Sequence, residues 1–323
     1  MKLENRMSAQ STKYGMGTVM THKVFGEQAE ECLIAVWQEV ERIEAILSRF
    51  LPDSEISRIN CLAGFRCEIV SPETYEVLSQ AVEFSRHCQG CFDITMGPLV
   101  SLWSADPDTT RPPDISQIRQ TLHLVNYRDL ILDPYQRTAG LRKAGQSIDL
   151  GGIGKGFTGD KILVTYREFG ISSAYSNLGG NVVTLGAKPD GSPWQIGIQH
   201  PRQENRIIGA VSVVNQSVVT SGDYQRYITD SNGNRYHHIL DPSTGYPSES
   251  GLISVTVVAD NSMTADALST ILFIAGIKKG LEILRDYPQT EVILVDTNMQ
   301  VFVTRGLKDH FQANDNIQVN ILE

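Results

Sequence analysis

The first third of the chain carries the pattern of amphipathic helices. In residues 27–49, apolar side chains recur every three or four positions, at Ala29, Leu33, Val36, Val40, Ile43 and Leu47. This spacing puts them on one helical face, so we predict a helix packed on the core through that face. Residues 72–87 predict a second helix, because Pro72 suits a first helical turn and Gly90 suits a helix end.

From residue 147 the pattern changes to short β-like runs separated by glycines. The predicted strands cover residues 147–150, 173–176, 194–199, 207–214 and 218–221. Two further runs, 224–229 and 235–240, flank the dipeptide Asn232-Gly233, which is typical of a β-hairpin turn. A strand over 253–259 then leads into a helix with start signals at Asn261 and Ser262 and an end signal at Gly276.

These elements predict a single α+β unit with a helical N-terminal part and a sheet-rich C-terminal half. No internal repeat and no Pro/Gly-rich linker divides the sequence. We expect the active site in the cleft between the two parts, a flexible tail over residues 1–14 and one folded domain over 15–323. The polar, proline-rich residues 107–113 are the best candidate for an insertion or lid.

Composition excludes several classes of partner. The 323 residues are 41% hydrophobic and 20% charged, the balance of a globular protein, and the formal net charge of −9 argues against nucleic acid. No run approaches the ~18 apolar residues of a membrane span, and the N-terminal segment has no apolar stretch typical of a signal peptide. We therefore expect a cytoplasmic protein, or a membrane-anchored or periplasmic one if a native signal was removed. The five cysteines have no metal-like spacing.

A glycine cluster between Asp149 and Phe157 is the first candidate for chemistry. Glycines allow the backbone to approach a ligand closely, and the N-terminus of the helix predicted over 157–169 offers free N–H groups to a phosphate. Lys155 would add a point charge. The segment matches neither the Walker loop nor the Rossmann fingerprint, so a plain tight turn from strand to helix remains an alternative.

A second candidate lies at the start of the later helix. Asp266 and Thr270 are four residues apart and share one helical face, with Ser269 adjacent. Their oxygens suit Mg²⁺, which takes few protein ligands and completes its shell with water and phosphate oxygens. The alternative is structural, since an Asp in a first turn interacts with the helix dipole and a Thr bonds to the preceding turn.

Histidines supply a candidate base. His237 and His238 point to opposite faces of a strand, so at most one of them faces a site. A histidine beside a phosphate accepts or relays a proton at neutral pH, whereas the alternative is an ordinary surface histidine in a hairpin.

The segment from Phe92 to Trp103 combines a carboxylate, a glycine and a large aromatic ring, which suits a planar ligand. A Trp103 packed in the core is the alternative. The neighbouring Cys88 and Cys91 lack a thioredoxin-like context, so we interpret them as buried or incidental thiols.

Together these segments resemble the FAD:protein FMN transferase family, the ApbE-like flavin transferases, from Met16 to about Gly276. The blocks that carry the resemblance occur in family order at residues 16–18, 48–60, 92–98, 149–157, 177–180, 220–223, 238–245 and 265–270. The resemblance implies that residues 15–323 form an ApbE-like domain.

The resemblance also implies a set of ligands. The Gly154 carbonyl, Asp266 and Thr270 would bind Mg²⁺, with Ser269 standing where many relatives carry an acidic ligand. The implied FAD pocket is lined by Met16, Phe50, Asp93, Trp103, Ser104, Ala105, Gly151, Lys155, Phe157 and His238. Relatives often have Trp-Gly where this chain has Trp103-Ser104.

The implied reaction is the cleavage of FAD with transfer of FMN to a Thr or Ser of an acceptor flavoprotein, which releases AMP. Lys155 and Asp266 are the expected catalytic residues together with His238, which would deprotonate the acceptor hydroxyl. Asp223 and Asp241 are weaker candidates for that base. Two alternatives stay open: a metal-dependent FAD pyrophosphatase that uses water, and a carrier that binds FAD without cleaving it.

Overall fold

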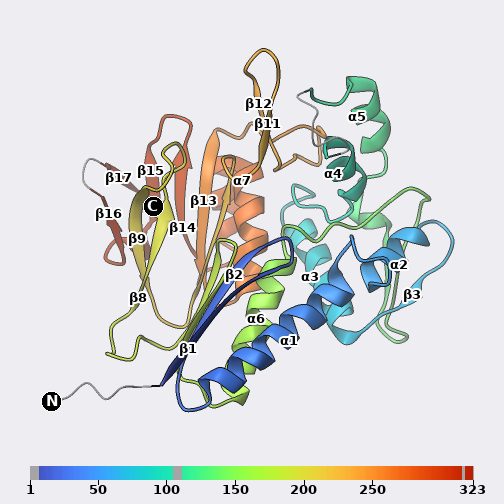
Figure 1. Ribbon diagram of the computed structural model, residues 1–323. Helices are drawn as coiled ribbons and strands as arrows, with labels where there is room; N and C mark the ends of the chain where they lie inside the picture. The colour runs from blue at the N-terminus through green and yellow to red at the C-terminus, as the bar shows by residue number, and fades with distance from the viewer. Residues whose placement is uncertain (1–6, 105–110, 315–316, 323) are drawn as a thin grey trace.

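The computed structural model describes residues 7–104, 111–314 and 317–322, and a nine-stranded sheet forms its centre (Figure 1). Neighbouring strands are antiparallel except β15 and β17, which are parallel. The order across the sheet is β1 (Ser8–Gly15), β2 (Thr18–Phe25), β6 (Ser173–Leu178), β7 (Asn181–Leu185), β10 (Ser217–Gly222), β13 (Leu252–Ala259), β14 (Glu291–Asp296), β15 (Val301–Thr304) and β17 (Val319–Leu322).

Both faces of this sheet are covered. Helices α1 (Ala29–Leu47), α6 (Gly154–Glu168) and α7 (Ser262–Leu284) lie on one face, and a small sheet of β8 (Trp194–Gln199), β9 (Ile207–Val213) and β16 (Phe311–Ala313) lies on the other (Figure 1). The side chains of β13 fit this arrangement: Val255 and Val257 belong to the core beside α7, whereas Val258 and, across a register irregularity at Leu252–Ser254, Ile253 belong to the core beside β8 and β9. Every residue of β13 is therefore buried.

The remaining elements lie outside the nine-stranded sheet, the three helices on its face and the small sheet of β8, β9 and β16. They are α2 (Glu55–Cys61), β3 (Glu68–Ile69), α3 (Pro72–His87), α4 (Gly97–Trp103), α5 (Ile115–Leu122), η1 (Tyr127–Asp129), β4 (Leu130–Asp133), β5 (Thr138–Leu141), β11 (Tyr227–Thr229), β12 (Arg235–His237) and η2 (Arg305–Leu307). A small apolar cluster of Met96, Leu99, Ile118 and Leu240 joins α4 and α5 to the segment that follows β12.

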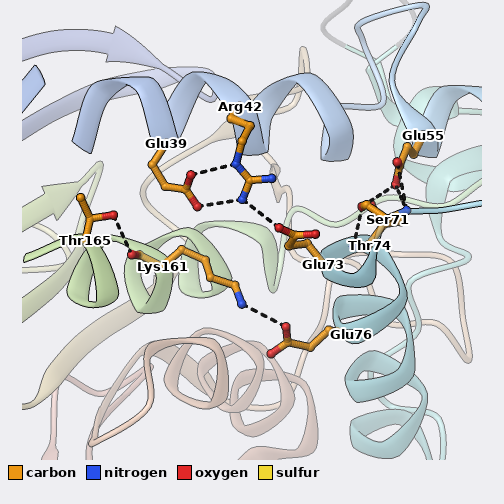
Figure 2. A network of polar contacts seen from close by, with 9 residues as sticks. All are labelled: Glu39, Arg42, Glu55, Ser71, Glu73, Thr74, Glu76, Lys161 and Thr165. Atoms are coloured by element: carbon orange, nitrogen blue, oxygen red, sulfur yellow. Dashed lines mark hydrogen bonds and ion pairs between the residues drawn. The ribbon is translucent and has the colours of Figure 1, made fainter. Parts of the chain in front are cut away.

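A polar network connects α6 to the N-terminal helices (Figure 2). Arg42 on α1 bonds Glu39 on its own helix at 2.8 Å and Glu73 on α3 at 3.0 Å, and Lys161 on α6 bonds Glu76 on α3 at 3.0 Å. Partly exposed pairs of this kind stabilise little individually. Together they connect α3 to α1 through Arg42 and to α6 through Lys161.

The predicted fold class is confirmed, and most predicted elements occur within a few residues of their expected bounds. The helix over 72–87 and the strand over 194–199 coincide with α3 and β8. The hairpin turn at Asn232-Gly233 joins β11 and β12. Among the described residues, no helix is both long enough and apolar enough to cross a membrane.

Two predictions about elements were wrong. Residues 8–14, predicted as part of a flexible tail, belong to β1, a largely exposed edge strand that pairs with β2 along its whole length. Residues 147–150 form no strand, because Asn60 takes the place of a neighbouring strand: its side chain bonds the N–H of Ile148 at 2.6 Å and its C=O at 3.1 Å. The end signal at Gly276 is confirmed in part: its backbone is non-helical, with φ of 72°, and a second helical stretch follows the kink within α7.

Candidate active site

The glycine turn and the start of α7 lie in direct contact. The Gly156 N–H donates to Asp266 Oδ2 at 2.8 Å. A Cβ at Gly156 would lie 2.6 Å from Asp266 Cβ and 2.5 Å from the carbonyl oxygen of Ser262. Only glycine lets the two helix N-termini approach this closely, so the two predicted motifs, over 100 residues apart in sequence, form one site.

Asp160 on α6 fastens the two helices further. Its carboxylate accepts the N–H groups of Ser262 at 2.7 Å and Met263 at 2.9 Å, and it accepts a bond from the Asn261 side chain at 2.9 Å. Burial raises the pKa of Asp160 to about 6, against the lowering effect of these N–H groups. The predictions missed this residue, whose partners lie about 100 positions away along the chain.

Oxygen atoms gather where the turn meets α7. Asp266 and Ser269 are buried, and the Ser269 hydroxyl bonds the Asp266 carbonyl at 2.8 Å and the Ser221 hydroxyl at 2.7 Å. Ser221 also lies 3.4 Å from Thr270 Oγ1. The Gly154 carbonyl, a predicted metal ligand, accepts a bond from the Thr158 hydroxyl at 2.8 Å. Ser221 belongs to the 220–223 block but had no predicted role.

This donor set fits a hard divalent cation. It offers one carboxylate, one backbone carbonyl and neutral hydroxyls, which are the oxygen ligands that suit Mg²⁺. Within the described residues, no hydrogen bond engages Asp266 Oδ1, so this oxygen is free for a ligand. The same part of the chain holds no group of three His, Cys, Asp or Glu arranged for a metal.

Two basic groups flank the turn. The Lys155 ammonium bonds the Gly151 carbonyl at 3.3 Å. His238 donates from Nδ1 to the carbonyl of Arg226 at 3.1 Å, since a carbonyl only accepts, and this leaves Nε2 as the free acceptor of the neutral ring. Desolvation by neighbouring atoms and the charges of Arg226 and Lys155 lower the pKa of His238, although this residue is exposed at the surface.

The two adjacent histidines have different partners, and His238 lies just outside β12, which ends at His237. The His237 ring packs edge-on against Phe273 of α7 at 5.4 Å between centroids and bonds the Ser248 carbonyl at 3.0 Å. Burial lowers its pKa. His237 is therefore partly buried against α7, whereas His238 is exposed, and its role in the site stays a prediction.

Aromatic side chains extend the site toward α4. Trp103 donates from Nε1 to the Gly245 carbonyl at 2.9 Å, and its ring lies 5.8 Å from that of Tyr236 and 6.0 Å from that of Tyr246. The neighbouring Ser104 is exposed. The predicted pocket residue Ala105 lies outside the described residues.

Met16 and Phe50 occupy two different settings. Met16 forms the β1–β2 turn with φ of 48°, a conformation unusual for a residue other than glycine, and its sulfur lies 3.2 Å from the Thr158 hydroxyl of α6. Phe50 is 80% exposed beside the guanidinium of Arg49. An exposed phenylalanine of this kind is available to a planar ligand.

Several predicted residues are engaged inside the protein. Asp93 is buried and accepts bonds from the N–H groups of Thr95 at 2.8 Å and Tyr127 at 2.7 Å, and burial raises its pKa. Phe157 is 1% exposed and belongs to the main core. Both side chains are therefore buried in this structure, and their place in the FAD pocket stays a prediction.

The two weaker candidates for the base are also engaged. The Asp223 carboxylate forms two bonds of 2.7 Å with the guanidinium of Arg202. Asp241 accepts the Ser243 N–H at 2.7 Å and closes a turn. His238 consequently stays the preferred candidate, because the carboxylate of Asp223 is paired with Arg202 and that of Asp241 closes a turn.

The fold and the site together define an α+β protein with an oxygen-rich centre at the contact of two helix N-termini. A family model described as the ApbE family matches residues 16–294, so this chain belongs to the ApbE family. The predicted family is confirmed.

Curated relatives and solved structures agree with this assignment. Proteins named FAD:protein FMN transferase are 34% identical in Klebsiella pneumoniae, over 93% of both chains, and 31% identical in Treponema pallidum, over 93% of this chain and 88% of the relative. The ApbE protein of Thermotoga maritima superposes with a TM-score of 0.87 at 30% identity, covering 94% of this chain and 99% of its own. Apo flavinyl transferase ApbE of Pseudomonas stutzeri gives 0.83 at 29% identity, with 97% and 100% covered.

Proposed function

We propose that this protein is an FAD:protein FMN transferase. It would cleave FAD at the diphosphate, attach FMN through a phosphoester to a Thr or Ser of an acceptor flavoprotein, and release AMP. The observation that carries the proposal is the contact of the glycine turn with Asp266, because it brings Lys155 and metal-type oxygens to one place. The names of the relatives support the same reaction.

The residues that would hold Mg²⁺ are Asp266 through Oδ1, Thr270 through its hydroxyl and Gly154 through its carbonyl. Ser269, bonded to Ser221 and to the Asp266 backbone, would orient these ligands. Bound Mg²⁺ would supply Lewis acidity to the diphosphate and align it for attack. With a single carboxylate in this set, the protein alone should bind the cation weakly.

The chain itself supplies charge and a base. Lys155 and the N-terminus of α6 stabilise the negative charge of the leaving AMP phosphate. Neutral His238 accepts the hydroxyl proton of the acceptor at Nε2, while its Nδ1–H bond to Arg226 fixes the ring. The hydroxyl oxygen then bonds the FMN phosphorus as the bond to the AMP oxygen breaks.

The test is incubation of the protein with FAD, Mg²⁺ and a candidate acceptor flavoprotein, followed by mass spectrometry of the intact acceptor. Transfer adds one FMN mass, and removal of the metal with a chelator or the change Asp266→Asn abolishes it. The matched control is Asp260→Asn, an exposed aspartate just before α7.

Two results would contradict the proposal. Release of AMP and free FMN, without an adduct on any acceptor, would indicate a pyrophosphatase. FAD that stays intact with Mg²⁺ and acceptor present would indicate a carrier.

A further inference from the structure

One cation near the glycine turn has no part in the proposed reaction. Arg49 follows α1, and its side chain is 16% exposed. Its Nη1 donates to Asp149 Oδ2 at 2.7 Å and to the Gly97 carbonyl at 3.3 Å, and its Nη2 bonds the Ser101 hydroxyl. One guanidinium therefore joins the end of α1, the start of α4 and the carboxylate that precedes the glycine turn.

Asp149 connects Arg49 to the glycine turn. Its second oxygen, Oδ1, accepts the Gly151 N–H at 2.7 Å, while its own N–H is bonded to the Ile94 carbonyl at 2.7 Å. The Gly151 carbonyl in turn accepts the Lys155 ammonium at 3.3 Å. A continuous series of hydrogen bonds thus runs from Arg49 to the lysine that would bind phosphate.

Arg49 also contacts the element that carries the aromatic end of the site. Gly97 and Ser101 lie on α4, which ends at Trp103. A planar guanidinium with several donors can hold a carboxylate and two further acceptors together, whereas a lysine ammonium lacks this fork.

We propose that Arg49 is a positioning residue for FAD, which fixes the glycine turn relative to α4 so that the diphosphate and ring subsites are held at the correct separation. The inference rests on the proposed function, since FAD is the ligand assumed. Arg49 touches no reacting atom in this account and acts through Asp149.

The test measures FAD affinity separately from transfer. Titration of FAD, followed by the change in flavin fluorescence on binding, gives its Kd, and steady-state transfer gives KM and kcat. We expect Arg49→Gln to raise the Kd and KM for FAD about 10-fold, the size expected when a charged hydrogen bond that favours binding is lost. Arg49→Lys should resemble Arg49→Gln more than wild type. Arg86→Gln, which removes an exposed ion pair of α3, should match wild type.

A double-mutant cycle with Asp149→Asn distinguishes a positioning role from a merely structural effect. Because both side chains act through one pair, the double variant should raise the Kd no further than Arg49→Gln alone. The inference is overturned if Arg49→Gln lowers the thermal midpoint while the Kd stays at the wild-type value, or if the two changes add. If Arg49→Gln does not fold, Arg49→Lys and Asp149→Asn decide by the same Kd criterion.

The two proposals fail in different ways. A wild-type protein that binds FAD without transferring FMN contradicts the proposed function, and the Kd comparison still decides the role of Arg49. A wild-type protein that transfers FMN, with an Arg49→Gln variant of equal Kd, contradicts only the inference. A wild-type protein without FAD affinity contradicts both.

Discussion

Gly156 is the position at which the contact between α6 and α7 can be tested most directly. An added Cβ would lie 2.5 Å from the Ser262 oxygen, 2.6 Å from Asp266 Cβ and 2.7 Å from Met263 Cα. Two of these atoms are backbone, so the helices themselves must separate, by roughly 1 Å to reach the 3.5 Å of ordinary contact. Gly156→Ala therefore strains the packing and stretches the Gly156 N–H bond to Asp266 together.

The expected cost follows from these two effects. Overpacking costs about 1–3 kcal/mol, and a weakened hydrogen bond to a buried carboxylate costs about 1.5–3 kcal/mol. Alanine regains up to ~1 kcal/mol over glycine through helix propensity. We expect Gly156→Ala to lower the free energy of unfolding by roughly 2–4 kcal/mol, measured from urea unfolding followed by circular dichroism.

Gly154→Ala is the matched stability control on the same helix. Its added Cβ would meet only Leu150 Cβ at 3.7 Å, so its stability should equal or exceed that of wild type. The reasoning is refuted if the two alanine variants unfold at the same urea concentration. It is also refuted if Gly156→Ala loses stability but keeps wild-type affinity for FAD and Mg²⁺, because Asp266 would then not depend on the contact.

Three further predictions concern titrating and charged groups. Burial lowers the pKa of His22 to about 4 from 6.5. The unfolded chain therefore binds more protons, and the free energy of unfolding should fall by roughly 3 kcal/mol as the pH falls from 6.5 to 4. His22→Gln should flatten this part of the pH dependence of urea unfolding. The pKa of His238 is lowered, so the acid limb of kcat/KM should lie below pH 6.5 and should disappear in His238→Gln; an acid limb that is unchanged in this variant would exclude this histidine as the base. Asp223→Asn should lower the free energy of unfolding by about 1–3 kcal/mol, because Arg202 loses its partner, while FMN transfer persists; loss of transfer in the folded variant would contradict our assignment.

What could be predicted from the sequence was governed by local patterns. The helix over 72–87 depends on an apolar face and terminators within its own segment, so its bounds were predicted correctly. Residues 147–150 carry the alternation of a strand, yet the Asn60 side chain satisfies the backbone of Ile148. No local pattern predicts that a side chain takes the hydrogen bonds of a neighbouring strand, because the partner lies 88 residues away.

The residues of the candidate site also divide into those that local motifs predict and those that depend on distant partners. The glycine turn, Asp266 and His238 were predicted from motifs, and the structure brings Asp266 into contact with the turn. Asp160 and Arg49 were missed, because each acts through partners about 100 positions distant. Residue type alone does not distinguish them from ordinary surface charges.

The glycine cluster shows that a motif can be required for a reason other than the one its sequence suggests. The sequence assigns these glycines to ligand approach, whereas two of them are also required by packing. A Cβ at Gly152 would lie 3.1 Å from the Phe92 ring and 3.3 Å from Thr270 Oγ1, and one at Gly156 would collide with α7. Because Thr270 and Asp266 are the candidate metal ligands, the space that these glycines leave empty sets the distance from the turn to the cation site. Side chains added here would displace the ligands before any substrate entered.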